Sequence, residues 1–180
     1  MQTRQLKVEP ATAANVAPFG VLLGVRADSP PRHSAFYGDS VELWAPGQFQ
    51  SDADTCLSLA RVHPRANDVI WMERHFKHTQ AFIPLGGAPF VVVLGAPTET
   101  HTPDPDSVKA LRFDGRAGFM MHIGTWHEFP FAIDAATDMI VVLRNETNRD
   151  LEVRENNEAV GGDLEKRNMR TRLGLSFSFS

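Results

Sequence analysis

Prolines and glycines divide this chain of 180 residues into short apolar runs. Twelve prolines and thirteen glycines separate runs at 41–44, 56–62, 80–84, 90–94, 119–123 and 139–143. Each run is rich in β-branched or aromatic residues and is too short for a typical helix. We therefore expect many short antiparallel strands. Helix is expected only in short pieces, one capped by Thr12 and ending before Pro18, and one capped by Asp106 over residues 107–111.

Length and strand pattern together indicate one all-β domain, built as a sandwich or barrel. The end of the chain differs, because residues 148–172 are dense in charge and contain the pair Gly161-Gly162. We expect this stretch to be partly mobile. Residues 173–180 then alternate apolar and polar, as a strand does. The sequence thus predicts a domain at 1–160 and a charged extension at 161–180, with a possible edge strand that closes a sheet or pairs with a second subunit.

Composition removes several classes of function. The net charge is −4, which argues against a nucleic-acid or anionic-membrane surface. No apolar stretch reaches 18 residues, so we expect no membrane span, and the first residues lack the apolar run of a signal peptide. Cys56 is the one cysteine, which favours a reducing, cytoplasmic location. Phosphate-binding glycine loops and serine-hydrolase motifs are missing from the sequence.

Two segments hold most of the residues that could carry chemistry. In the first, Glu73 and His75 would point to the same face of a strand, and Gln80 follows. In the second, Gly124 allows a turn that re-aims His127. The oxygen and nitrogen donors of Glu73, His75 and His127 would suit a divalent metal ion, although neutral Gln80 is a poor substitute for a carboxylate.

Other polar residues have two readings each. Arg61 could hold a substrate carboxylate or form a surface ion pair, and His122 could donate a proton or lie in the core. Trp126 could line a pocket or belong to the core. Arg74 points away from Glu73, so we expect it to be structural or at a subunit contact. His78 lies in a turn, where a role at the rim of the site and simple solvation are equally plausible.

The two segments resemble the paired motifs of the cupin superfamily. Glu73-x-His75, four residues, Gln80, six residues, Gly87 keeps the spacing of the first motif, with Glu in place of its first His and Gln in place of its Glu. Gly124 to His127 reproduces the end of the second motif. In cupins these side chains converge inside a small barrel and hold a divalent metal ion. The resemblance implies a cupin-type double-stranded β-helix (jelly-roll barrel) with short helices and one such ion.

A closer resemblance is to the bacterial ureidoglycolate lyase family. It rests on Glu73-Arg-His75, on Thr79-Gln-Ala-Phe-Ile-Pro84, and on the spacing of Gly118, His122 and Trp126-His127. It extends from about residue 10 to about residue 153, with departures at 42–46, 76–78 and Glu128. The resemblance implies that the chain is a homodimeric enzyme. It would cleave the C–N bond of (S)-ureidoglycolate to glyoxylate and urea in allantoin breakdown.

That reaction needs a base at the substrate hydroxyl and an acid at the departing nitrogen. Our hypothesis makes Glu73, or a hydroxide on a bound metal ion, the base and His122 the acid. His75, Gln80 and His127 would orient the substrate or the metal, Arg61 would hold the carboxylate, and Trp126 would contact the substrate. Two alternatives are a lyase, isomerase or amidohydrolase for another small carboxylate, and a cupin that binds a ligand without catalysis.

Overall fold

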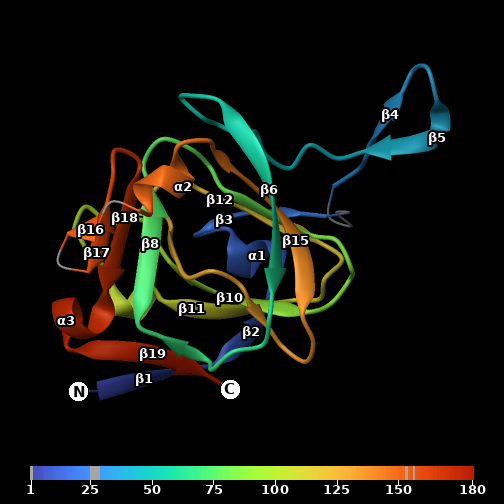
Figure 1. Ribbon diagram of the computed structural model, residues 1–180. Helices are drawn as coiled ribbons and strands as arrows, with labels where there is room; N and C mark the ends of the chain where they lie inside the picture. Colours follow the sequence, from blue (N-terminus) through green and yellow to red (C-terminus); the bar gives the residue numbers. More distant parts are fainter. Residues whose placement is uncertain (1, 25–28, 153, 156) are drawn as a thin grey trace.

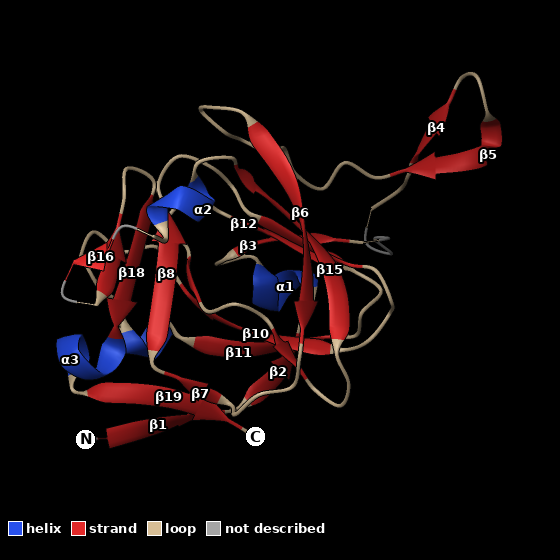
Figure 2. Cartoon of the chain, in the orientation of Figure 1, coloured by secondary structure: helices blue, strands red, loops and turns tan. Residues whose placement is uncertain are grey.

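The fold is all-β, as the sequence predicts. We describe it from a computed structural model, which places residues 2–24, 29–152, 154–155 and 157–180. Strands form nearly all of the regular structure, and the helices are single turns (Figure 2). The helical elements are α1 (Ala13–Val16), η1 (Pro105–Ser107), α2 (Thr147–Asp150) and α3 (Met169–Leu173). In the described part of the chain, no helix has the length and apolarity of a membrane span.

Two large sheets pack face to face and form the barrel (Figure 1). The first sheet has the order β16 (Arg154–Glu155), β17 (Glu158–Val160), β18 (Leu164–Asn168), β8 (Trp71–His75), β13 (Trp126–His127), β10 (Phe90–Gly95), β11 (Lys109–Phe113) and β2 (Val8–Pro10), with β14 (Phe131–Ala132) also paired to β10. The second has the order β3 (Gly20–Leu23), β12 (Gly118–Met121), β9 (Ala81–Pro84), β15 (Thr137–Arg144) and β6 (Thr55–Val62). Most of these pairings are antiparallel, so the structure confirms the cupin-type architecture.

Two smaller sheets complete the molecule. One has the order β1 (Gln2–Leu6), β19 (Leu175–Phe179) and β7 (Asp68–Val69), and it lies below the barrel in Figure 1. The other is the hairpin of β4 (Arg32–Ser34) and β5 (Gly38–Leu43), which projects from the barrel (Figure 1). The tip of this hairpin exposes Phe36 and Tyr37.

Strand β10 shows how the layers share the core. Its alternate side chains Phe90, Val92 and Leu94 point between the two large sheets. Val91 and Val93 point the other way, into a second apolar cluster that includes Phe177 of β19. A strand buried on both faces reads as a continuous apolar run, which is why residues 90–94 stand out in the sequence.

The predicted helices are half right. Thr12 caps α1, since its Oγ1 accepts a hydrogen bond from the Asn15 N–H at 3.2 Å. The helix expected at 107–111 is wrong. Asp104 caps only the short η1 turn, and residues 109–113 form β11, antiparallel to β10. Burial of Ala110, Leu111 and Phe113 on a sheet outweighs the local capping signal, because helix propensity is a weak preference that packing overrides.

The charged stretch forms strands and short helices where the structure describes it, and the expectation that it is partly mobile stays a prediction. Strand β18 pairs along its length with β8, and β19 pairs with both β1 and β7. The strand predicted near the end of the chain is therefore present, but it is the middle strand of its sheet rather than an edge. A domain boundary at residue 160 stays a prediction; both strands beyond it are hydrogen-bonded to strands before it.

Ion pairs explain how so many charges can pack. The carboxylate of Glu158 accepts hydrogen bonds from Arg172 at 2.5 Å, from Arg167 at 2.8 Å and from the Asn168 backbone N–H at 3.0 Å. Glu165 receives Arg74 at 2.7 Å and Arg167 at 2.6 Å. Buried charges are tolerated when they are paired and hydrogen-bonded in this way. The expected structural role of Arg74 agrees with this pair.

Leu164 tests whether β18 belongs to the folded core. Its side chain is fully buried, whereas that of Leu85 is 54 % exposed. We expect Leu164→Ala to lower the free energy of unfolding by about 2–5 kcal/mol. The matched change Leu85→Ala should alter it by less than about 0.5 kcal/mol. Urea denaturation followed by circular dichroism measures both, and equal effects would mean that β18 does not contribute to the core.

The ion pairs of Glu158 predict acid sensitivity. Hydrogen bonding to Arg172, to the Asn168 backbone and to Arg167 outweighs burial and lowers the pKa of Glu158 to about 2. Because the folded pKa lies below the unfolded one, this stabilisation is complete above about pH 5 and is lost as the pH falls towards 2. Urea denaturation at several pH values should show wild type more stable than Glu158→Gln at pH 6, with the difference shrinking towards pH 2. A difference that stays constant over that range would contradict this account.

Candidate active site

Three adjacent strands place three charged or titratable side chains in one row. In the register of the first sheet, Glu73 of β8 is paired with His127 of β13 on one side and with Lys166 of β18 on the other. Directly paired residues on neighbouring strands present their side chains on the same face. The Lys166 Nζ lies 2.9 Å from Glu73 Oε2, and the His127 Nε2 lies 3.4 Å from Glu73 Oε1. The sheet therefore builds a cation–carboxylate–imidazole row inside the barrel.

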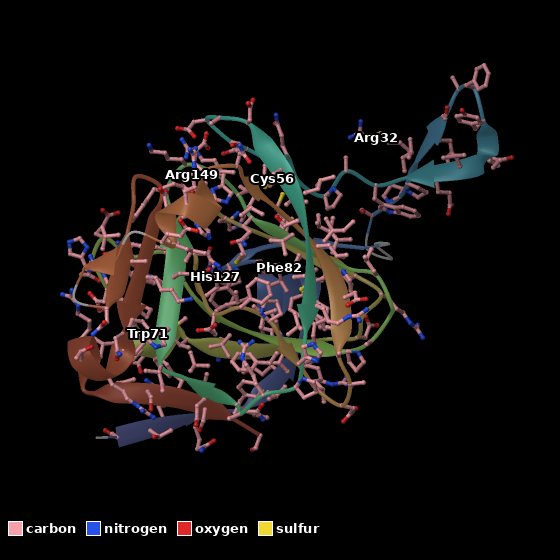
Figure 3. All side chains as sticks on the ribbon, viewed as in Figure 1. Arg32, Cys56, Trp71, Phe82, His127 and Arg149 are labelled. Carbon is pink, nitrogen blue, oxygen red and sulfur yellow. The ribbon has the colours of Figure 1, made fainter. Side chains whose placement is uncertain are left out.

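His127 is aimed by the turn before it. Gly124 has a φ of +84°, a conformation that glycine adopts easily, and its N–H donates to the His75 carbonyl at 2.7 Å. The His127 Nδ1 lies 3.1 Å from the Thr125 carbonyl, which directs Nε2 towards Glu73. Figure 3 shows His127 and Phe82 inside the barrel, and their rings meet edge to face at 6.4 Å. The predicted role of Gly124 in turning His127 inward is confirmed.

The Glu73 carboxylate is buried and ionised. Burial raises its pKa, but the Lys166 ammonium and the neighbouring His127 outweigh burial and hold it well below the ordinary value. Burial alone would lower the pKa of Lys166, and the carboxylates of Glu73 and Glu128 reverse this and raise it. Lys166 thus keeps Glu73 ionised and Glu73 keeps Lys166 protonated, which is the condition for such an ion pair to persist.

A cavity of about 210 Å³ opens beside this row. Glu73, His75 and Gln80 line its polar side. The remaining lining residues are Ser58, Ala60, Phe129, Val141, Leu143, Thr147 and Leu151. A volume below the roughly 300–1,000 Å³ of sites for drug-sized ligands suits a small metabolite. The Gln80 Oε1 is buried and has no hydrogen-bond partner among the described residues, so it is free to accept one from a ligand.

A second cluster of titratable groups shares His75. The Nδ1 atoms of His75 and His78 lie 3.7 Å and 2.9 Å from Asp163 Oδ2, and the two imidazole rings are 4.6 Å apart. All three side chains are almost completely buried. Burial lowers the pKa of His75 to about 3, with His127 adding to the shift, so the ring is neutral at physiological pH. His78, expected at the rim or in solvent, lies inside instead.

Three of the predicted site residues lie outside both the charged row and this cavity. Arg61 is exposed on β6 and forms a two-pronged ion pair with Asp138, with distances of 2.7 and 2.8 Å. His122 is exposed and follows the end of β12. Trp126 is buried on the opposite face of the sheet from His127, in the second apolar cluster, with its Nε1–H donated to Thr98 at 2.9 Å. Alternation along β13 explains the last case, because neighbours on a strand face opposite ways.

Lys166, Asp163 and His78 were missed as site residues. The first two lie in the stretch that we expected to be mobile. One signal was available, since Leu164 and Lys166 are two residues apart and share a face of any strand that buries Leu164. The position of His78 depends on Asp163, which is 85 residues away in the chain, and spacing within a motif does not encode such a contact.

The metal set expected from the cupin spacing fits by distance but not by charge. One donor atom each from Glu73, His75 and His127 lie within 4.8 Å of one another, so the structure brings the predicted ligands together. However, Glu73 is already neutralised by Lys166 at 2.9 Å. A divalent ion bound to that carboxylate would lie beside the half-buried ammonium group of Lys166, which repels it. We therefore derive no reaction step through a metal at these three residues.

Comparison with known proteins identifies relatives over most of the chain. The sequence profile of a family described as ureidoglycolate lyase matches residues 3–161. A ureidoglycolate lyase of Pseudomonas savastanoi pv. phaseolicola is 31 % identical over 147 residues, which cover 79 % of this chain and 84 % of the relative. One of Stutzerimonas stutzeri is 33 % identical over 150 residues, with coverage of 79 % and 84 %. Asp163 and Lys166 lie just beyond the residues that the family profile matches.

Lys166 offers a test of the charged row. We expect Lys166→Met to raise the pKa of the Glu73 carboxyl. Burial raises this pKa and the Lys166 charge lowers it, so removing the charge leaves the effect of burial less opposed. Carboxyl ¹³C chemical shifts recorded against pH measure this pKa, with Glu73→Gln to assign the signal. The control Arg61→Met removes an exposed cation on β6 and should leave the pKa of Glu73 unchanged. A Glu73 pKa that is the same in wild type and Lys166→Met would contradict the assigned role of Lys166.

Proposed function

The chain belongs to the ureidoglycolate lyase family, and from this premise we propose that it cleaves the C–N bond of ureidoglycolate to give glyoxylate and urea. In this substrate the hydroxyl and the ureido nitrogen are attached to the same carbon. Loss of the hydroxyl proton forms the aldehyde C=O bond, the C–N electrons pass to nitrogen, and the nitrogen takes up a proton to leave as urea. The site must therefore move one proton over a short distance.

The observation that carries the proposal is the buried Glu73 carboxylate at the wall of a small cavity. Bulk water does not reach a buried carboxylate and so does not compete with it for the proton of a bound substrate. The carboxylate can therefore accept that proton from the substrate hydroxyl. We assign the proton from the substrate hydroxyl to Glu73. The burial of Glu73 against Lys166 also explains why the carboxylate remains charged until substrate arrives.

Protonation of the leaving nitrogen can use the same pair of groups. The His127 Nε2 is 3.4 Å from Glu73 Oε1 and has no hydrogen-bond partner among the described residues. Because hydroxyl and nitrogen share one carbon, groups this close can take a proton from one and supply it to the other. We therefore propose His127, rather than the exposed His122, as the group that assists nitrogen departure. A general acid–base pair contributes roughly 10²–10⁴-fold to the rate.

Two further residues are proposed to recognise the substrate. The free Oε1 of Gln80 can accept a hydrogen bond from the urea N–H groups. Lys166, already beside Glu73, is the cation that we assign to the substrate carboxylate in place of Arg61, whose guanidinium is engaged by Asp138 on the outside of the barrel. Charge-assisted hydrogen bonds of this kind combine affinity with orientation.

The assembly and location of the enzyme also belong to this proposal. We propose a homodimer, supported by the hairpin tip that holds Phe36 and Tyr37 away from the barrel and by the exposed Leu57 and Leu59 of β6. Exposed apolar groups of this size often mark contacts between subunits. We propose a cytoplasmic location from the lone, unpaired Cys56. One divalent metal ion remains part of the proposal but enters none of the proton transfers above.

The activity prediction concerns Glu73. We expect Glu73→Gln to lower kcat for ureidoglycolate by about 10²–10⁴-fold, because an amide cannot accept the hydroxyl proton. The control Arg61→Gln should stay within about threefold of wild type, since Arg61 lies outside the cavity. Release of urea from racemic ureidoglycolate, corrected for spontaneous decay, measures both rates.

The same assay decides between catalysis and simple binding. Wild type that releases urea no faster than the spontaneous background, while ureido acids raise its melting temperature, would overturn the lyase proposal in favour of a binding protein. Activity in Glu73→Gln equal to wild type would retain the lyase and remove Glu73 from the mechanism. A strong loss of activity in Arg61→Gln would indicate that Arg61, and not Lys166, binds the substrate carboxylate.

A further inference from the structure

We propose that this chain binds a divalent transition-metal ion through His75, His78 and Asp163, and not through the three residues that the cupin spacing selects. His75 is common to both sets. The other two ligands are a histidine outside the cupin spacing and an aspartate beyond the part of the chain that the family profile matches. The inference concerns metal binding alone and does not depend on the proposed reaction.

The distances suit a single ion. One donor atom each from His75, His78 and Asp163 lie within 4.8 Å of one another. Two atoms that bind one tetrahedral ion at about 2.1 Å lie roughly 3.4 Å apart. The Asp163 Oδ2 is 2.9 Å from the His78 Nδ1 and 3.7 Å from the His75 Nδ1, on either side of that value. A small movement of side chains would therefore complete a coordination sphere.

Hydrogen bonding leaves these imidazoles free for a metal. Both ring nitrogens of His75 and both of His78 are buried and lack a hydrogen-bond partner among the described residues. His78 and Asp163 are close but not aligned as a hydrogen bond. Buried polar atoms normally find a partner, so four unpaired nitrogens in one place need an explanation. A metal ion that accepts a lone pair from one nitrogen of each ring accounts for two of the four.

Further hydrogen bonds hold the carboxylate of Asp163 in place. Its Oδ1 accepts the Lys77 backbone N–H at 2.8 Å, and its Oδ2 accepts the Thr147 hydroxyl at 2.9 Å. The Asp163 N–H in turn donates to Asp150 at 3.1 Å. Metal-binding carboxylates are typically oriented by a shell of such hydrogen bonds. Thr147 and Asp150 both belong to α2, so this single helical turn positions the ligand.

Charge favours this set over the cupin set. Asp163 has no lysine or arginine side chain among its hydrogen-bond and ion-pair partners in the described residues, whereas Glu73 is paired with Lys166 at 2.9 Å. A divalent ion at Asp163 is therefore attracted by a carboxylate that no lysine or arginine side chain contacts directly. Two imidazoles and one carboxylate suit ions of the Zn²⁺, Co²⁺ and Ni²⁺ type.

Variants separate the two sets, with Zn²⁺ as the probe and isothermal titration calorimetry on protein freed of metal. We expect His78→Gln and Asp163→Asn each to weaken Zn²⁺ binding at least 30-fold. Glu73→Gln and His127→Gln should stay within threefold of wild type. Melting temperatures in the presence of a chelator show whether each variant folds. The opposite pattern, with binding lost in Glu73→Gln and His127→Gln and kept in the first pair, would overturn the proposal.

A second experiment uses wild-type protein, so its result does not depend on whether the variants fold. Crystals of wild type soaked in Zn²⁺ and measured at the zinc absorption edge should show an anomalous peak bonded to His75, His78 and Asp163. A peak bonded to Glu73, His75 and His127, or no peak within either group, would refute the assignment. Zinc found only on surface side chains counts as an adventitious ion only and refutes it equally.

Discussion

The ionised Glu73 in the barrel interior is the constraint on which the rest of the site depends. A lone carboxylate in an apolar core would be costly, and proteins avoid this cost by pairing the charge. Here the pairing is built into the sheet, because the register places His127 and Lys166 on the two strands that flank β8. His127 belongs to the second cupin-like segment, and Lys166 belongs to the charged end of the chain. Both must be in register for the carboxylate to be tolerated.

The charged end of the chain is thus part of the barrel and not an appendage. High charge density usually signals a segment that cannot bury enough apolar surface to fold. This segment escapes that rule because its acids and bases neutralise each other, Glu158 with Arg172 and Glu165 with Arg74, while Leu164 and Met169 supply apolar anchors. The pattern of charge that looks solvated in the sequence is an internal network in the fold.

Sequence alone predicted the features that depend on local pattern. The strands at residues 56–62 and 90–94, the cap at Thr12, the turn at Gly124 and the shared face of Glu73 and His75 follow from composition, turn chemistry and period-two alternation. The strand at 109–113 was missed because burial overrides propensity. Lys166, Asp163 and His78 were missed because their contacts join segments more than 80 residues apart, and register between distant strands is set by the whole sheet. Arg61 and His122 were chosen by chemistry without knowledge of which way their strands face.

The pairing of β18 with β8 and of β19 with β1 and β7 has a consequence for biosynthesis. Nascent chains emerge from the ribosome amino end first, and their early segments begin to fold before the later ones exist. In this chain β1 cannot pair until β19 has been made, and the candidate site lacks the charges of Asp163 and Lys166 until residues 163–166 have emerged. The protein therefore acquires its chemistry late in translation, and a product truncated near residue 161 would lack β18, β19 and the site residues Asp163 and Lys166.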